Sequence, residues 1–213
     1  MHTLLDLFLH LDVHLANVIA QYGTMTYVLL FTVLFCETGL VVTPFLPGDS
    51  LLFAAGAFVA SGKLHLALLL FLLSTAAILG DTVNYWVGRK FGAAVLAKGT
   101  FLGLPVKKEH LERTKYFFEK YGSKTIVIAR FMPIVRTLAP FVAGVGRMQY
   151  RRFAIFNIVG GLLWVSLFVF GGYFFGNLPV VRHNFTLVIL AVIVISLIPP
   201  SIEVWRSKKN LSS

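Results

Sequence analysis

The sequence contains a single cysteine, Cys36, among 213 residues. One cysteine excludes an intrachain disulfide and a cysteine-based zinc site. Charged residues are also scarce at 13%, whereas hydrophobic residues make up 57% and the mean hydropathy is +0.82. No P-loop occurs, which excludes ATP hydrolysis by this chain as a source of energy. The composition and the long apolar runs predict one integral membrane domain over residues 1–213.

Lysine and arginine are missing from residues 1–62, although the net charge of the chain is +10. Such asymmetry is typical of the positive-inside rule, so we expect the later basic segments and the C-terminus to be cytoplasmic. The excess charge is then explained by orientation and anionic headgroups, and we expect no nucleic-acid partner. The N-terminus lacks a basic region and a small-residue cleavage site, so no cleavable signal peptide is expected.

Apolar runs and their interruptions divide the chain into eight segments. Some runs are long enough to cross a bilayer, others are too short, and two stretches are amphipathic. The predicted segments are an amphipathic helix at 1–22, a re-entrant hairpin at 25–61, a spanning helix at 64–88, a cytoplasmic amphipathic region at 89–124, a second re-entrant hairpin at 125–146, spanning helices at 153–175 and 184–204, and a basic tail at 205–213.

Helix-breaking residues interrupt both predicted hairpins. Pro44, Pro47 and Gly48 divide the first, and Pro133 and Pro140 divide the second. The apolar arms are shorter than the roughly 20 residues that a spanning helix needs. Irregular backbone at membrane depth is tolerated only where protein or a water-filled cavity surrounds it. We therefore predict that each hairpin enters and leaves the membrane on one side.

The order of the segments suggests an inverted repeat. A hairpin open to the outside is followed by a helix that runs inward, and a hairpin open to the inside is followed by a helix that runs outward. Many secondary transporters have this architecture, with the site where the hairpin tips meet. The predicted fold is an all-α integral membrane protein with two re-entrant hairpins, spanning helices and amphipathic surface helices.

Four charges fall inside the broken apolar stretches: Glu37 and Asp49 in the first, and Arg130 and Arg136 in the second. A charge at bilayer depth is costly and is usually functional. Guanidinium groups match phosphate oxygens, so we predict that the arginines bind a phosphate. The acids are predicted to exchange a proton or to pair with the arginines. The alternative is that acid–arginine pairs only hold the hairpins together.

Three further polar residues are secondary candidates for the cavity. Asp81 is compatible with lining the cavity or with a local bond to Asn84 and the hairpin backbone, whereas Asn157 favours a hydrogen bond between packed helices. His10 and His14 are four residues apart, but the pattern favours a polar helix face over a metal pair. No metal site and no cofactor are expected. Trp164 is interpreted as an interface anchor.

The motifs together resemble the DedA family, relatives of the SNARE-associated Golgi or VTT-domain lipid scramblases. The resemblance extends over nearly the whole chain. It is carried by Phe35-Cys36-Glu37-Thr38-Gly39, Pro44-Phe45-Leu46-Pro47-Gly48-Asp49-Ser50, Gly80-Asp81, Asn84-Tyr85, Gly88-Arg89, Arg130-Phe131-Met132-Pro133, Val135-Arg136-Thr137, Pro140, Ala143-Gly144, Phe153, Asn157 and Trp164.

The resemblance implies a multi-pass protein of the bacterial inner membrane that moves lipids between leaflets. It implies undecaprenyl phosphate or a phospholipid as substrate, dependence on the proton motive force and a role in envelope integrity. The two acids and two arginines essential in the family fall on Glu37, Asp49, Arg130 and Arg136. Which lipid is moved does not follow from the resemblance.

Three rival functions fit parts of the pattern. A proton-coupled transporter of a small anion or other solute fits the architecture equally well. An enzyme that acts on lipids is not expected, because no nucleophile with a base and no metal site stand out. A pure scaffold fails to explain two arginines at depth. Small residues at 160–161 and 171–172 are compatible with packing within one chain or between copies in a homo-oligomer.

Overall fold

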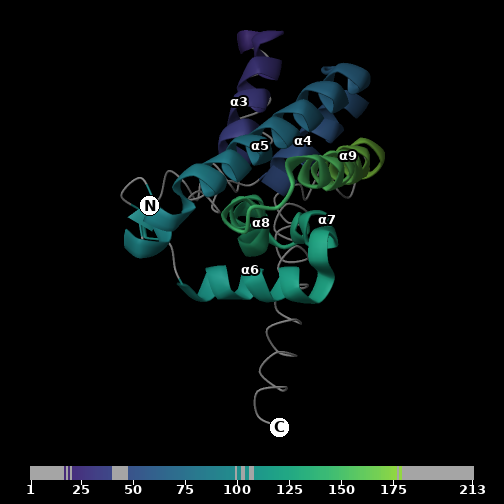
Figure 1. Cartoon of the computed structure of the whole chain (residues 1–213). Coiled ribbons are helices and arrows are strands. Elements are labelled where there is room, and N and C mark those ends of the chain that lie inside the picture. Colours follow the sequence, from purple (N-terminus) through teal and green to yellow (C-terminus); the bar gives the residue numbers. More distant parts are fainter. Residues whose placement is uncertain are drawn as a thin grey trace. The chain divides into compact units, whose positions relative to one another are not determined.

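A computed structural model describes residues 17, 19, 21–39, 48–98, 100–101, 104–105, 108–176 and 178 of the chain (Figure 1). The predicted N-terminal amphipathic helix, the breakers Pro44 and Pro47, the last spanning helix and the basic tail lie wholly or mostly outside these residues, as do His10 and His14. The described elements are α3 (Met25–Gly39), α4 (Gly48–Ala60), α5 (Leu66–Lys98), β1 (Thr100–Phe101), β2 (Leu104–Pro105), α6 (Lys108–Tyr121), the 3-10 turn η1 (Gly122–Lys124), α7 (Thr125–Ala129), α8 (Pro133–Val145) and α9 (Tyr150–Phe175).

Two helices are long and apolar enough to cross a membrane. They are residues Leu66–Gly92 of α5 and Tyr150–Phe175, which is the whole of α9. These correspond to the spanning helices predicted at 64–88 and 153–175. Helix α5 continues to Lys98, beyond its predicted end, and the β1–β2 pair follows it. The alanine-rich run at 93–97 favours continuation of the helix, because alanine has the highest helix propensity.

Three apolar helices are too short to span a bilayer. Helix α3 has 15 residues, and α4 and α8 have 13 each. A spanning helix needs about 20 residues, so the structure agrees with the lengths that define the predicted hairpins. Gly48 begins α4, as a helix breaker at that position predicts.

The two prolines of the second predicted hairpin have opposite effects. Met132 is extended, with φ −128° and ψ 100°, and Pro133 occupies the first turn of α8. A proline excludes the helical conformation from the residue before it, so the break between α7 and α8 falls where the sequence predicts. Pro140 was expected to break the chain too, and that prediction is wrong because Pro140 lies inside α8. It lacks an N–H and so cannot donate to the carbonyl of Arg136.

The chain divides into two compact units. One contains residues 1–32, 47–74 and 164–213, and the other contains 33–46 and 75–163. In the first unit α4 packs directly on the C-terminal half of α9. A Cβ atom on Gly172 would overlap the carbonyl of Phe53, and one on Gly56 would overlap the carbonyl of Val169. Small residues therefore bring two helix backbones together, as is common between membrane helices.

The second unit uses the same device between α8 and α5. A Cβ atom on Gly88 would overlap the carbonyl of Phe141, and one on Gly144 would overlap the carbonyl of Tyr85. Helix α6 runs along α8 and leads through η1 into α7 (Figure 1). The buried ring of Phe117 attaches α6 to this core, and the Thr125 hydroxyl donates to the Phe117 carbonyl over 2.7 Å. Helix α6 lies within the region predicted to be amphipathic.

Candidate functional site

Arg136 and Glu37 form a buried ion pair between the last turn of α3 and the first turn of α8. Arg136 Nη2 lies 2.5 Å from Glu37 Oε1, and the two residues are 5% and 1% exposed. The break before Pro133 directs the start of α8, and so Arg136, toward the end of α3. A buried charge pair requires close geometry to offset the cost of desolvation. Of the acid–arginine pairs predicted between the two broken stretches, the pair between Glu37 and Arg136 is present.

Arg130 lies in the turn between α7 and α8 and is held from two helices. Its Nη2 lies 2.5 Å from Asp81 Oδ2 of α5 and 2.5 Å from Asn157 Oδ1 of α9. Gly160 of α9 lies against its side-chain stem, where an added Cβ would be 3.0 Å from Arg130 Cδ. The carboxylate and the amide oxygen therefore fix the guanidinium in a slot that glycine keeps open.

Asn157 is itself held in one orientation. Its Nδ2 donates to the carbonyl of Ile78 over 3.0 Å and approaches the hydroxyl of Thr82 at 3.5 Å. Because the amide nitrogen faces these acceptors, its oxygen faces Arg130. The predicted hydrogen bond between packed helices is present, and the same side chain also positions an arginine.

Asn84 braces the two short helices that carry the Glu37–Arg136 pair. It is fully buried, and its Nδ2 donates to the carbonyl of Thr38 over 3.3 Å and to that of Thr137 over 2.8 Å. Thr38 follows Glu37 and Thr137 follows Arg136. Asn84 thus fixes the backbone beside each charge, an arrangement that neither residue type nor spacing reveals in the sequence.

Asp49 belongs to the other unit, where it accepts a hydrogen bond from Trp164. Trp164 Nε1 lies 2.9 Å from Asp49 Oδ1, joining the first turn of α4 to the middle of α9. Trp164 is 0% exposed, so its interpretation as an interface anchor is wrong. An indole with a buried N–H needs an acceptor, and the carboxylate of Asp49 supplies one.

The structure brings six of the sequence candidates into one unit: Glu37, Asp81, Asn84, Arg130, Arg136 and Asn157. Asp81, a secondary candidate in the sequence, is a full member of this charged centre. The centre contains two guanidinium groups and two carboxylates, all of them buried.

Metal chemistry has no assembled ligand set in the described part of the chain. No group of three or more histidine, cysteine, aspartate or glutamate residues lies close enough there to hold a metal ion. The described centre contains arginine, amide and carboxylate groups only.

Comparison with known proteins places these features in a family. The family model for the VTT domain matches residues 46–174. The chain is 51% identical over 208 residues to Protein DedA of Escherichia coli strain K12, covering 97% of this chain and 94% of that protein. It is 39% identical over 194 residues to the uncharacterized membrane protein Rv0364 of Mycobacterium tuberculosis H37Rv, covering 89% and 84%.

A third relative is named for its location. The chain is 37% identical over 173 residues to the inner membrane protein YghB of Escherichia coli strain K12, covering 81% of this chain and 75% of that protein. No solved structure matches the chain. The family match, the extent of these similarities and the two helices of spanning length lead to one conclusion. The chain belongs to the DedA family of VTT-domain membrane proteins.

Proposed function

We propose that the chain moves a phosphate-bearing lipid, undecaprenyl phosphate or a phospholipid, between the leaflets of the bacterial inner membrane. The observation that carries this proposal is the buried Arg136–Glu37 pair, formed where two helices too short to span the membrane come together. A lipid phosphate that crosses hydrocarbon needs a cationic partner at depth, and arginine stays charged at any cellular pH.

The mechanism is an exchange of anions at arginine. In the empty protein, Glu37 neutralises Arg136 and Asp81 neutralises Arg130. An entering phosphate competes for the guanidinium donors, and protonation of Glu37 releases Arg136 to bind it. Release of the phosphate and deprotonation of Glu37 restore the internal pair. The scheme needs neither ATP nor a covalent intermediate, and we assign no catalytic reaction to the chain.

The same packing device in both units supports an inverted repeat. Short helix α4 packs backbone to backbone on spanning helix α9, and short helix α8 does so on spanning helix α5. Each helix that follows a predicted hairpin tip thus packs on the spanning helix of the opposite half. We propose on this basis that α3–α4 and α7–α8 are re-entrant hairpins that open to opposite sides, with the C-terminus in the cytoplasm.

Transport in liposomes tests the proposal. The purified chain is reconstituted with a trace of head-labelled phosphatidylglycerol or undecaprenyl phosphate, and the fraction accessible to an external quencher is followed over time. We expect accelerated movement between leaflets compared with protein-free liposomes. Uptake of labelled inorganic phosphate without lipid movement would instead identify a transporter of a small anion, and the lipid proposal would be wrong.

A further inference from the structure

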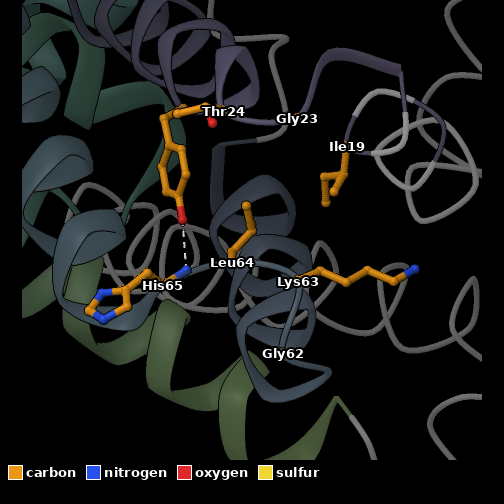
Figure 2. Close-up of a pocket in the computed structure, with 8 residues that line it drawn as sticks. Ile19, Gly23, Thr24, Gly62, Lys63, Leu64 and His65 are labelled. Atoms are coloured by element: carbon orange, nitrogen blue, oxygen red, sulfur yellow. Dashed lines mark hydrogen bonds between the residues drawn. The ribbon is translucent and has the colours of Figure 1, made fainter.

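A cavity that shares no residue with the charged centre lies where helices α3 and α5 begin and helix α4 ends. It is bounded by the turn before α3, the turn after α4 and the first residue before α5, and has a volume of about 440 Å³. Its lining residues are Ile19, Gly23, Thr24, Tyr27, Gly62, Lys63, Leu64 and His65 (Figure 2). Small-molecule sites usually occupy about 300–1,000 Å³, so the cavity is large enough for a ligand.

Glycine gives the cavity its shape. Helix α4 ends at Ala60, and Gly62 follows it with φ +75°. The Lys63 N–H donates to the Phe58 carbonyl over 3.0 Å, and the Gly62 N–H donates to the Val59 carbonyl over 2.9 Å. These are the two bonds of a Schellman motif. The motif requires one residue in the left-handed backbone conformation, which glycine adopts without strain. The motif ends the helix sharply and places Lys63 at the cavity.

The cavity is rich in hydrogen-bond donors, and none of its described lining residues is acidic. Lys63 supplies an ammonium group, Thr24 a hydroxyl and Tyr27 a second hydroxyl. The Tyr27 oxygen already accepts the His65 backbone N–H over 2.6 Å, so its own hydrogen can be donated to a ligand. Figure 2 shows the Lys63 side chain extending on the same side as Ile19, with the His65 ring on the opposite side. Such a set of donors fits an anion.

Lys63 is isolated from the other positive charges of the sequence. It is the only lysine or arginine among the first 88 residues. In the topology expected from the charge distribution, this end of α5 faces away from the cytoplasm, where lysine is depleted. The positive-inside rule therefore does not explain the position of Lys63. Its ammonium lies 5.3 Å from the centre of the Phe58 ring, which holds it near the end of α4.

Apolar surface beside the cavity selects a lipid rather than a free anion. Helix α3 exposes Met25 and Val28 just after its start, at 66% and 59%, and α5 exposes Leu68 and Phe71 just after its start, at 41% and 68%. Both sets belong to the first two turns of helices whose starts bound the cavity. A ligand with its phosphate in the cavity would therefore have hydrocarbon-compatible surface for its acyl chains within reach.

From this geometry we infer that the cavity binds the headgroup of a phospholipid in the leaflet on this side, with Lys63 as the partner of the phosphate and Tyr27 and Thr24 as donors to the rest of the headgroup. This binding does not depend on the chain being a transporter. If the proposed function is correct, the cavity is where a headgroup waits before or after crossing.

Binding of short-chain lipids to the purified full-length chain tests the inference. Native mass spectrometry counts the bound molecules of dioctanoyl phosphatidylglycerol during a titration, with dioctanoylglycerol as the phosphate-free probe. We expect Lys63→Gln to lose one bound phospholipid and to weaken that binding step about tenfold, since a charged hydrogen bond is removed. Tyr27→Phe should weaken the same step a few-fold, and dioctanoylglycerol should not occupy it.

Lys90→Gln is the matched control. Like Lys63, Lys90 is exposed and has its ammonium over a phenylalanine ring, 5.6 Å from the centre of the Phe91 ring. Lys90 lies on α5 and is not among the residues that line the cavity. The Lys90→Gln variant should bind phospholipid as the unmodified chain does. Equal binding by the Lys63→Gln variant would overturn the inference. Displacement of the lipid by equal concentrations of inorganic phosphate would also overturn it, because the ligand would then be a free anion. The binding measurement uses no ion gradient and no transport step. Its outcome can therefore be interpreted even if the chain does not transport lipid.

Discussion

Arg136 Nη2 and Glu37 Oε1 lie 2.5 Å apart although the residues are 99 positions apart in the chain. Their burial makes the pair costly unless both partners are present. A purely structural pair and a functional pair therefore respond alike to single substitutions. They differ when both charges are removed together.

The first prediction concerns removal of one or both charges. Glu37→Leu or Arg136→Met alone should destabilise the chain by about 3–5 kcal/mol, because the remaining charge is buried without its partner. The double variant Glu37→Leu/Arg136→Met should recover most of that loss and yet not move lipid. Thermal unfolding in detergent measures stability, and the liposome assay measures transport. A double variant that transports at the normal rate would show that the pair is only structural.

The second prediction concerns the slot that holds Arg130. Alanine at Gly160 would place its Cβ 3.0 Å from Arg130 Cδ and 3.2 Å from Val127 Cα, so the guanidinium has to shift away from Asp81 and Asn157. Overpacking of this kind costs about 1–3 kcal/mol, and we expect a marked loss of transport. Gly171→Ala is the control in the same helix, because its Cβ would meet the Phe53 ring at 3.8 Å. Similar effects of the two substitutions would contradict this account of the slot.

The third prediction separates the two roles of Asp49. Asparagine retains an oxygen that accepts from Trp164, so Asp49→Asn should change stability by less than about 1 kcal/mol. Trp164→Phe removes the donor and much of a fully buried ring, and should cost at least about 2 kcal/mol. If Asp49 also exchanges a proton, Asp49→Asn should lose transport despite normal stability. Normal transport with unchanged pH dependence in this variant would leave Asp49 with a structural role only.

The fourth prediction concerns the packing of α4 on α9. Alanine at Gly172 would drive its Cβ into the backbone carbonyl of Phe53, and backbone cannot move aside as a side chain does. We expect Gly172→Ala to lower the unfolding temperature clearly, whereas its neighbour Gly171→Ala should leave it unchanged. Thermal unfolding of the two variants side by side checks the contact. Equal stability of both would contradict the close approach of these two backbones.

Local chemistry explains which features could be predicted from sequence. The lengths of α3, α4 and α8 follow from apolar runs, and the break at Met132 follows from the effect of Pro133 on the residue before it. The prediction that Pro140 breaks the helix is wrong, because a proline can lie inside a helix where the surrounding structure tolerates the missing hydrogen bond.

Partner choice in the charged centre could not be predicted, because it depends on how helices pack. Asp81 reaches Arg130 only because α5 and the α7–α8 turn adjoin in the folded unit, and Asn157 completes the slot from α9. The carbonyls of Thr38 and Thr137 that accept from Asn84 carry no signal in residue type. One signal for the packing face of α5 is present in the sequence. Residues four positions apart lie on one face of a helix, and the small or polar residues of α5 with this spacing are Gly80, Asn84, Gly88 and Gly92.

The most direct test of the central claim is leaflet-resolved transport by the Glu37→Leu/Arg136→Met double variant beside the unmodified chain, in liposomes at two pH values. We predict that the unmodified chain moves phosphatidylglycerol or undecaprenyl phosphate at a rate that changes with pH. The double variant, folded to similar stability, should move neither lipid above the protein-free rate. Equal, pH-independent lipid movement by both proteins would contradict a phosphate-exchanging role for Arg136 and Glu37.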